Sequence, residues 1–400
     1  MRSDSLKILY KLCILVSLFV FLAGCWDRTE LNDLALITAM AFDQAEDKQI
    51  QVTVQIIIPQ NQGGGGMTGG TSGGAPKKTT VRGEKGINIS DALSKLQRKI
   101  PRRLFWGQCK VFIFSEEVAK SGIKDEFDFL VRHPQPRERA YMFVSKGKAA
   151  DLLELFPPIE RSSSEVLREM ADFQIGIKVT LEQLSMLLKG DAEASALPIV
   201  HILPKAKSAE PFQAMPYIMG SALFKKDKMV GRISEKTTRG VMWILNEIDE
   251  YTVTFTMDGR DELVSLKPVK AKVKLLPKME GDKWMMTIKV SAEGDIIQNG
   301  TVLNPMNPKL LEKMDKAFED DVRERIEQAL REVQHKNKVD ILGFATAFHR
   351  KYPKQWEKNK DHWDELFPKV EVTIDVDASI QRPGLINAPG GIPEEEVQEK

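Results

Sequence analysis

The stretch QIQVTVQIII, residues 49–58, alternates apolar β-branched side chains with polar ones over most of its length. This period of two predicts a strand that buries one face and exposes the other. A second apolar, β-branched run precedes it at residues 34–42, and the polar residues 43–48 separate the two. We therefore expect the fold to begin with a hairpin of two paired strands.

Beyond this hairpin, helical and strand patterns follow one another in irregular order. The helical patterns place apolar residues three and four positions apart. They lie at residues 90–100, 116–131, 148–156, 163–174 and 181–189, and further strands are expected at 108–114 and 140–145. Because helices and strands do not alternate regularly as in a wound parallel sheet, the pattern predicts an α+β fold.

The second half of the chain follows a proline-rich stretch. Residues 191–216 contain four prolines, which indicates a linker between domains. Alternating runs after it predict consecutive strands as far as residue 290. Asn307 then begins a long helix of about residues 308–336 with a proline in its first turn, and residues 370–376 alternate as a last strand.

These boundaries predict three domains, each with a mixed or antiparallel sheet and packed helices. The expected segments are a cleaved signal peptide at 1–24, an N-terminal α+β domain at 25–190 with a flexible Gly-rich loop at 61–76, a linker at 191–216, a strand-rich middle domain at 217–290, a C-terminal α+β domain at 291–384 and a polar tail at 385–400. The Gly-rich loop lacks the pattern of a phosphate-binding loop, because Pro76 precedes Lys77 and no helical pattern follows at once.

The N-terminus has the three parts of a bacterial lipoprotein signal. Basic residues lie near the start, an apolar run covers residues 12–22, and Leu22-Ala23-Gly24-Cys25 closes the segment as a lipobox. The apolar run is too short for a spanning helix. We expect cleavage before Cys25 and two or three acyl chains on that residue, which would anchor the protein on the outer face of a membrane. An ordinary cleaved signal with a chance cysteine is the alternative.

The composition argues against several classes of function. Lys plus Arg numbers 58 and Asp plus Glu 57, so the 400-residue chain has no excess of positive charge that would attract nucleic acid. Its five histidines are scattered along the chain, which argues against a metal site, and no Gly-x-Ser-x-Gly nucleophile motif occurs. We therefore expect no catalytic residue, no cofactor and no metal.

Cysteine and tryptophan residues each have a structural and a functional interpretation. Cys109 lies in an apolar run and has no disulfide partner if Cys25 is lipidated, so we expect a buried thiol rather than a reactive one. Aromatic residues with helical spacing near the C-terminus, Trp356 and Trp363 among them, are typical of a hydrophobic core. Since Trp is enriched at interface hot spots, these two residues are also candidates for a partner surface.

Several stretches together resemble the Ger(x)C family, the lipoprotein C subunits of nutrient germinant receptors in endospore-forming bacteria. They are GCWDRTELNDLA at 24–35, RRL with the following strand at 102–114, ALFKKDKMVG at 222–231, TRG at 238–240, and HRKYPKQW at 349–356 with Trp363, Phe367, Pro368 and the last strand after it. The family commonly has Gly-His where this chain has Gly107-Gln108, so no role is assigned to that histidine, and the Gly-rich loop is a long insertion.

The resemblance implies a three-domain α+β protein outside the spore inner membrane, held there through Cys25 and assembled with a polytopic A subunit and an integral-membrane B subunit. It implies a requirement in germination without catalysis, and only Cys25 carries over with a known chemical role. A substrate-binding lipoprotein of a transporter is the alternative, although the two similar lobes of such proteins would need a repeated βα pattern. A cell-wall hydrolase is a third hypothesis, for which no metal or carboxylate site assembles in the sequence.

Overall fold

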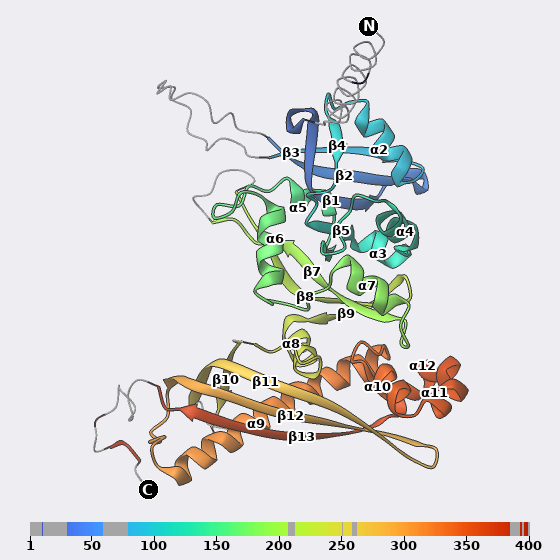
Figure 1. Cartoon of the computed structure of the whole chain (residues 1–400). Helices are drawn as coiled ribbons and strands as arrows, with labels where there is room; N and C mark the ends of the chain where they lie inside the picture. Colours follow the sequence, from blue (N-terminus) through green and yellow to red (C-terminus); the bar gives the residue numbers. More distant parts are fainter. Residues whose placement is uncertain are drawn as a thin grey trace.

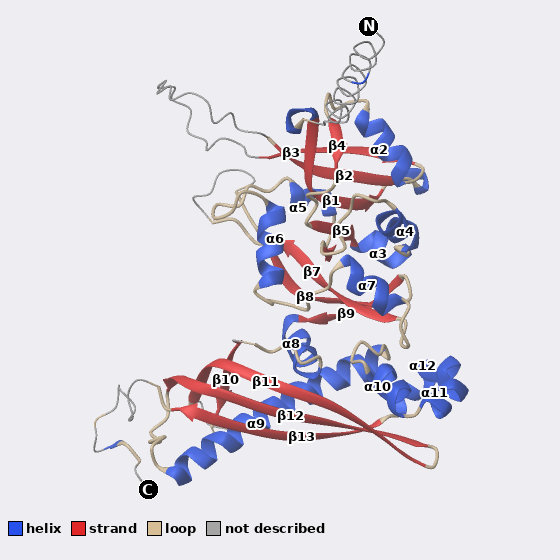
Figure 2. Ribbon diagram, viewed as in Figure 1, coloured by secondary structure: helices blue, strands red, loops and turns tan. Residues whose placement is uncertain are grey.

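The computed structural model describes residues 10, 30–58, 79–206, 213–249, 251–257, 262–384, 393 and 396–398. Apart from residue 10, the expected signal peptide lies outside the described residues, as do the lipobox with Cys25 and the Gly-rich loop. The described part contains two β-sheets with packed helices, the larger in the upper half of Figures 1 and 2 and the smaller below it. The predicted α+β class is confirmed.

The larger sheet has the strand order β3-β2-β1-β5-β6-β7-β8-β9, with the short β4 paired to β1 beside this path. Its central pairs from β1 through β5 and β6 to β7 are parallel, and the pairs at both ends are antiparallel. The strands are β1 (Leu34–Gln44), β2 (Ile50–Ile57), β3 (Thr79–Gly86), β4 (Arg103–Phe105), β5 (Val111–Ser115), β6 (Tyr141–Ser145), β7 (Ala194–Ile202), β8 (Pro216–Lys225) and β9 (Lys228–Ser234). The predicted hairpin is the antiparallel pair β1–β2.

Helices cover both faces of this sheet, because its central strands are apolar on both sides. In β5, Val111 and Ile113 pack with α5 and α6, whereas Phe112 and Phe114 belong to the core shared with α2, α3, α4 and α7. Figure 1 shows these two groups of helices on opposite sides of the sheet. The helices are α2 (Ile89–Gln97), α3 (Glu116–Ser121), α4 (Lys124–Arg132), α5 (Ala149–Leu153), α6 (Ser163–Asp172) and α7 (Leu181–Leu188).

In the described residues, the structure does not contain the linker predicted at residues 191–216. Its residues 194–202 form β7, which lies inside the larger sheet between β6 and β8. The proline signal was misleading because Pro198 is accommodated within β7, opposite Ser221, and Pro216 occupies the first position of β8, where a strand tolerates proline. The strand-rich segment expected at 217–290 is likewise divided, since β8 and β9 complete the larger sheet and only later strands enter the smaller one.

The smaller sheet has the order β10-β11-β12-β13, with β10–β11 and β11–β12 antiparallel and β12–β13 parallel. Helix α8 connects the two sheets, and the long helix α9 follows β12; the helix predicted at about 308–336 is confirmed as α9 continued by a π-helix. The elements are α8 (Glu235–Ile244), β10 (Tyr251–Thr256), β11 (Leu263–Glu280), β12 (Lys283–Asn299), α9 (Pro308–Leu330), the π-helix η3 (Arg331–Asn337), α10 (Phe344–Lys351), α11 (Pro353–Asn359), α12 (Trp363–Leu366) and β13 (Glu371–Arg382), with short 3-10 turns at Leu31–Asp33, Glu46–Lys48, Lys360–His362 and Phe367–Lys369.

Helix α9 packs along one face of the smaller sheet and binds both of its outer strands. Arg325 donates from Nη2 to the carbonyl oxygen of Thr254 in β10 at 3.0 Å. On the opposite edge, Asp315 accepts the backbone N–H of Ile380 in β13 at 2.7 Å, and Arg323 donates to the carbonyl of Ile374. Side chains of one helix thus satisfy backbone groups in both edge strands.

Candidate functional site

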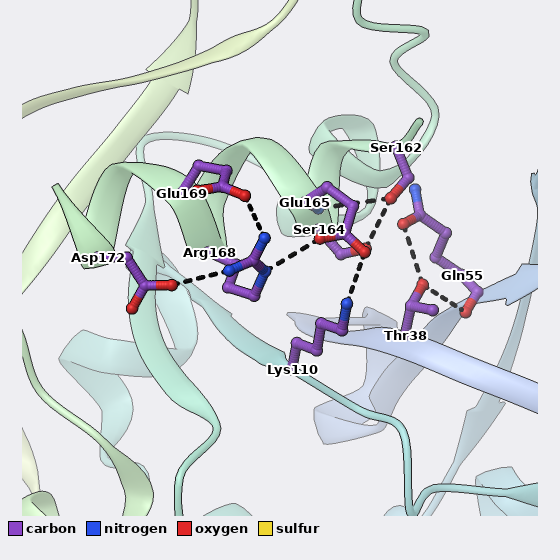
Figure 3. A network of polar contacts seen from close by, with 9 residues as sticks. All are labelled: Thr38, Gln55, Lys110, Ser162, Ser164, Glu165, Arg168, Glu169 and Asp172. Carbon is purple, nitrogen blue, oxygen red and sulfur yellow. Dashed lines mark hydrogen bonds and ion pairs between the residues drawn. The ribbon is translucent and has the colours of Figure 1, made fainter. Parts of the chain in front are cut away.

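A network of charged side chains attaches α6 to the larger sheet (Figure 3). Lys110, just before β5, donates to Oε1 of Glu165 at 2.6 Å, and Arg168 donates to the other carboxylate oxygen at 3.0 Å. Arg168 also reaches Asp172 at 2.8 Å and pairs with Glu169. Partial burial acts to raise the pKa of Glu165, but the hydrogen bonds from Lys110 and Arg168 outweigh it and lower that pKa. Every charge in the network has a partner, which is typical of a structural clamp rather than of acid–base chemistry.

Three consecutive serines at the start of α6 are buried, and their hydrogen bonds are structural. Ser162 is the N-cap, accepting the N–H of Glu165, and its hydroxyl lies 2.8 Å from that of Ser164. The hydroxyl of Ser163 donates to the carbonyl of Leu155 at 3.3 Å. Within the described residues, none of these hydroxyls is hydrogen-bonded to a histidine or a carboxylate that could activate a nucleophile.

Buried polar groups on β1 and β2 hold α5 against the sheet. The carboxylate of Asp43 accepts the backbone N–H groups of Ala149 and Ala150 at 2.7 and 2.9 Å. Gln55 donates to the carbonyl of Leu153 at 2.9 Å and accepts the hydroxyl of Thr38. Burial raises the pKa of Asp43, and the two backbone hydrogen bonds oppose that rise. These contacts satisfy the polar groups that the hairpin carries into the interior.

The two tryptophans that were candidates for a partner surface are buried and do not lie on the surface of the described structure. Trp356 and Trp363 are each 2% exposed, and their rings lie 5.1 Å apart. Trp363 also contacts Trp284 of β12, at 5.7 Å between ring centres, and Phe348 of α10. The aromatic rings fill the space between the C-terminal helices and the sheet, where their large apolar area is removed from water. The core interpretation is confirmed.

Cys109 is a buried thiol, as the sequence predicts. It is 1% exposed, and burial raises its pKa to about 12. A thiol with so high a pKa has almost no thiolate at neutral pH and is therefore unreactive. In the described part of the chain, no group of three or more His, Cys, Asp or Glu side chains is arranged to hold a metal ion. None of the described helices is both long and apolar enough to cross a bilayer.

Polar contacts also connect the parts built on the two sheets. His349 of α10 lies 2.8 Å from Asp191, which precedes β7, between Nδ1 and Oδ1. Lys225 at the end of β8 donates to the carbonyl of Ala192 at 2.9 Å and forms an ion pair with Asp364 of α12. Sequence patterns gave no signal for these pairs, because their members lie far apart along the chain.

A cleft of about 1170 Å³ opens on the side of the larger sheet that carries α2 and α4. Its walls are the N-terminal end of α2, most of α4, the turn between β1 and β2, the C-terminal end of α7 and the turn between β8 and β9. No sequence pattern indicates this cleft, because its five lining segments meet only after folding.

Comparisons with known proteins cover nearly the whole chain. Residues 27–202 match the family model described as "Spore germination protein N-terminal domain", and residues 219–384 match "Spore germination B3/ GerAC like, C-terminal". The chain is 31% identical to spore germination protein KC of Bacillus subtilis (strain 168), covering 96% of this chain and 97% of that protein. It is 22% identical to spore germination protein B3 of the same organism, covering 95% and 100%. The crystal structure of the GerBC protein has the same fold, with a TM-score of 0.55 at 20% identity over 86% of this chain and 96% of that one.

Proposed function

Because this chain belongs to the Ger(x)C family of spore germination proteins, we propose that it is the lipid-anchored, non-catalytic C subunit of a nutrient germinant receptor. The observation that carries this proposal is the end-to-end similarity to spore germination protein KC, which leaves no large part of either chain unmatched. Family membership gives the chain a role in spore germination. The lipid anchor, the A and B membrane subunits as partners and a place at the spore inner membrane are the proposed details.

The anchor at Cys25 would hold the folded part close to the bilayer. The described fold resumes at Glu30, five residues after Cys25, and five extended residues span at most about 17 Å. Two or three acyl chains, each methylene contributing about 0.8 kcal/mol when buried, are enough for stable membrane attachment. The subunit would therefore present its surfaces within reach of proteins embedded in the same membrane.

A scaffold function is supported by the contacts of the buried and half-buried carboxylates, which hold helices against the larger sheet. The carboxylates of Glu165 and Asp43 are bound by cations or backbone N–H groups that hold helices in place. A transporter's substrate-binding lipoprotein, the alternative, is not favoured, since the described strands form one nine-stranded and one four-stranded sheet rather than two similar lobes.

The proposal is tested by removing the lipidated thiol in spores whose sole nutrient receptor contains this chain. Cys25→Ala should abolish incorporation of labelled palmitate, release the protein from the membrane fraction and abolish germination in rich nutrient medium. Cys109→Ala is the matched control, because it removes the buried thiol and leaves the lipobox intact; it should retain label, membrane attachment and germination. Normal germination of Cys25→Ala spores with the protein free of the membrane would contradict the proposal.

A further inference from the structure

The cleft beside α4 combines an apolar floor with apolar side chains that remain exposed at its rim. Ile89 and Ile123 in the floor are buried, whereas Ile87 is 76% exposed and Val131 is 45% exposed. Both exposed residues line the same cleft and come from different segments, Ile87 just before α2 and Val131 in the last turn of α4. Large apolar side chains gathered around one depression are typical of a surface that another molecule covers.

One carboxylate in this cleft stands out from the other charges. Glu126 of α4 is half-buried, and among the described residues no cation pairs with it. Burial raises the pKa of Glu126, a hydrogen bond from its own backbone N–H opposes that rise, and the neighbouring charge of Asp125 adds to it. A carboxylate partly removed from water gains most from a cation that reaches it.

Two of the other carboxylates in the lining have partners, whereas the exposed Asp125 and the half-buried Asp227 have no ion pair among the described residues. Asp128 accepts two hydrogen bonds from Arg132, at 2.7 and 3.0 Å, and Glu193 pairs with Lys226 at 3.7 Å. The unpaired lysines of the lining, Lys48, Lys124 and Lys189, are exposed at the margin, where water solvates them. Among the described residues, the half-buried carboxylates of the lining without an ion pair are therefore Glu126 and Asp227, and both would be stabilised by a positive charge that reaches the cleft.

We infer that this cleft docks a segment of a partner protein that presents a lysine or arginine flanked by apolar side chains. The cation would pair with Glu126, and the apolar side chains would cover Ile87 and Val131. The size of the cleft suits a short helix or extended segment better than a single amine, and its apolar rim needs more apolar surface than an ion supplies. The inference rests on the proposed function in one respect, namely that the subunit works within an assembly.

The test uses photocrosslinking by the full-length chain in intact spores. The crosslinking residue p-benzoylphenylalanine replaces Val131, and the matched control places it at Val230 of β9, which is 53% exposed and lies outside the cleft. Position 131 should crosslink to one protein segment, identified by peptide sequencing, that contains Lys or Arg beside apolar residues. Position 230 should not crosslink to that segment. Crosslinks from position 131 to lipid alone, to a second copy of this chain or to a segment without a basic residue would overturn the inference.

Charge reversal gives a second, independent measurement. Glu126→Lys should lower the yield of the position-131 crosslink by about tenfold or more, and Lys or Arg→Glu in the captured segment should restore it. Glu117→Lys is the control, because it makes the same change of charge at an exposed position of α3 outside the cleft. An unchanged yield of the position-131 crosslink in Glu126→Lys, with normal protein levels, would refute the docking site. The proposed function would not be affected by that result, because the Cys25→Ala experiment tests it separately.

Discussion

The indole nitrogen of Trp363 donates a hydrogen bond to Oδ2 of Asp340 at 3.0 Å, inside the aromatic core beneath α10. Asp340 also accepts the backbone N–H groups of Leu342, Phe344 and Ala345, so four donors converge on one buried carboxylate. Burial raises the pKa of Asp340, and the four hydrogen bonds act against that rise. The carboxylate connects the start of α10 to α12, two helices that local sequence patterns do not place together.

We expect substitutions in this group to destabilise the fold in a fixed order. Trp363→Phe removes one donor and should cost about 1–3 kcal/mol. Asp340→Ala leaves four donors without an acceptor, the three backbone N–H groups and the indole N–H of Trp363, and should cost more than Trp363→Phe. Asp340→Asn keeps one acceptor oxygen and should fall between the two. Denaturant unfolding monitored by tryptophan fluorescence measures the order. Equal stability of Asp340→Ala and wild type would show that the carboxylate does not organise the core.

The clamp between β5 and α6 should depend on pH. The folded-state pKa of Glu165 lies below its ordinary value of 4.5, so its contribution to stability is present above that pH and is lost as the pH falls. Lys110→Met should therefore cost about 0.5–1 kcal/mol at pH 7 and much less at pH 3. Lys120→Met is the control, since its ion pair with Glu116 is a helix-surface pair at 2.6 Å. A constant difference between Lys110→Met and wild type across this range would argue against the clamp.

Glu247 is expected to weaken the fold above neutral pH. Its Oε2 is buried without a hydrogen-bond partner among the described residues, and burial raises its pKa to about 7. Because the folded protein holds this proton more tightly than the unfolded chain, stability should fall as the pH rises from 4.5 through 7. Glu247→Gln should then be more stable than wild type by about 1–3 kcal/mol at pH 8 and nearly equal to it at pH 4.5. Thermal unfolding at both pH values makes the comparison, and a Glu247→Gln protein less stable than wild type at pH 8 would contradict this assignment.

We expect Gly240 to be required for the close packing of α8 against α9. A Cβ at this position would overlap the carbonyl oxygen of Arg325 and touch the Cβ of Ala329 at 3.0 Å. Gly→Ala within a helix ordinarily stabilises by about 1 kcal/mol, but overpacking costs about 1–3 kcal/mol, so Gly240→Ala should be net destabilising. Thr346→Ala, at an exposed position of α10, is the control and should be neutral or slightly stabilising. A stabilised Gly240→Ala protein would mean that the helices do not approach so closely.

Local features of the fold were predictable because their signals lie within a few residues. The alternation in residues 49–58 specified β2, and Asn307 accepts the N–H groups of Lys309 and Leu310 at the start of α9 as a cap followed by proline should. The burial of Cys109 was predicted from its place in an apolar run, although the residue lies two positions before β5 rather than within a strand. Each of these predictions needs only the preferences of one element.

Sheet membership and burial depended on distant parts of the chain. β7 was hidden in a proline-rich stretch because its neighbours, β6 and β8, are what make it a strand. Trp356 and Trp363 carried the same ambiguity, since an aromatic residue suits a core and an interface equally until the packing around it is known. The cleft around Glu126 had no sequence signal, because its walls come from five separate segments.

The sequence alone determined the elements that have their own periodicity and caps, because the residues that specify each element are neighbours. It also predicts the lipoprotein signal on which the proposed anchor depends. Tertiary structure alone decided which strands share a sheet, how α9 contacts both edges of the smaller one, and which of the described carboxylates are partly buried without an ion pair. Those outcomes depend on contacts between residues tens to hundreds of positions apart, and such contacts exist only once the backbone has folded.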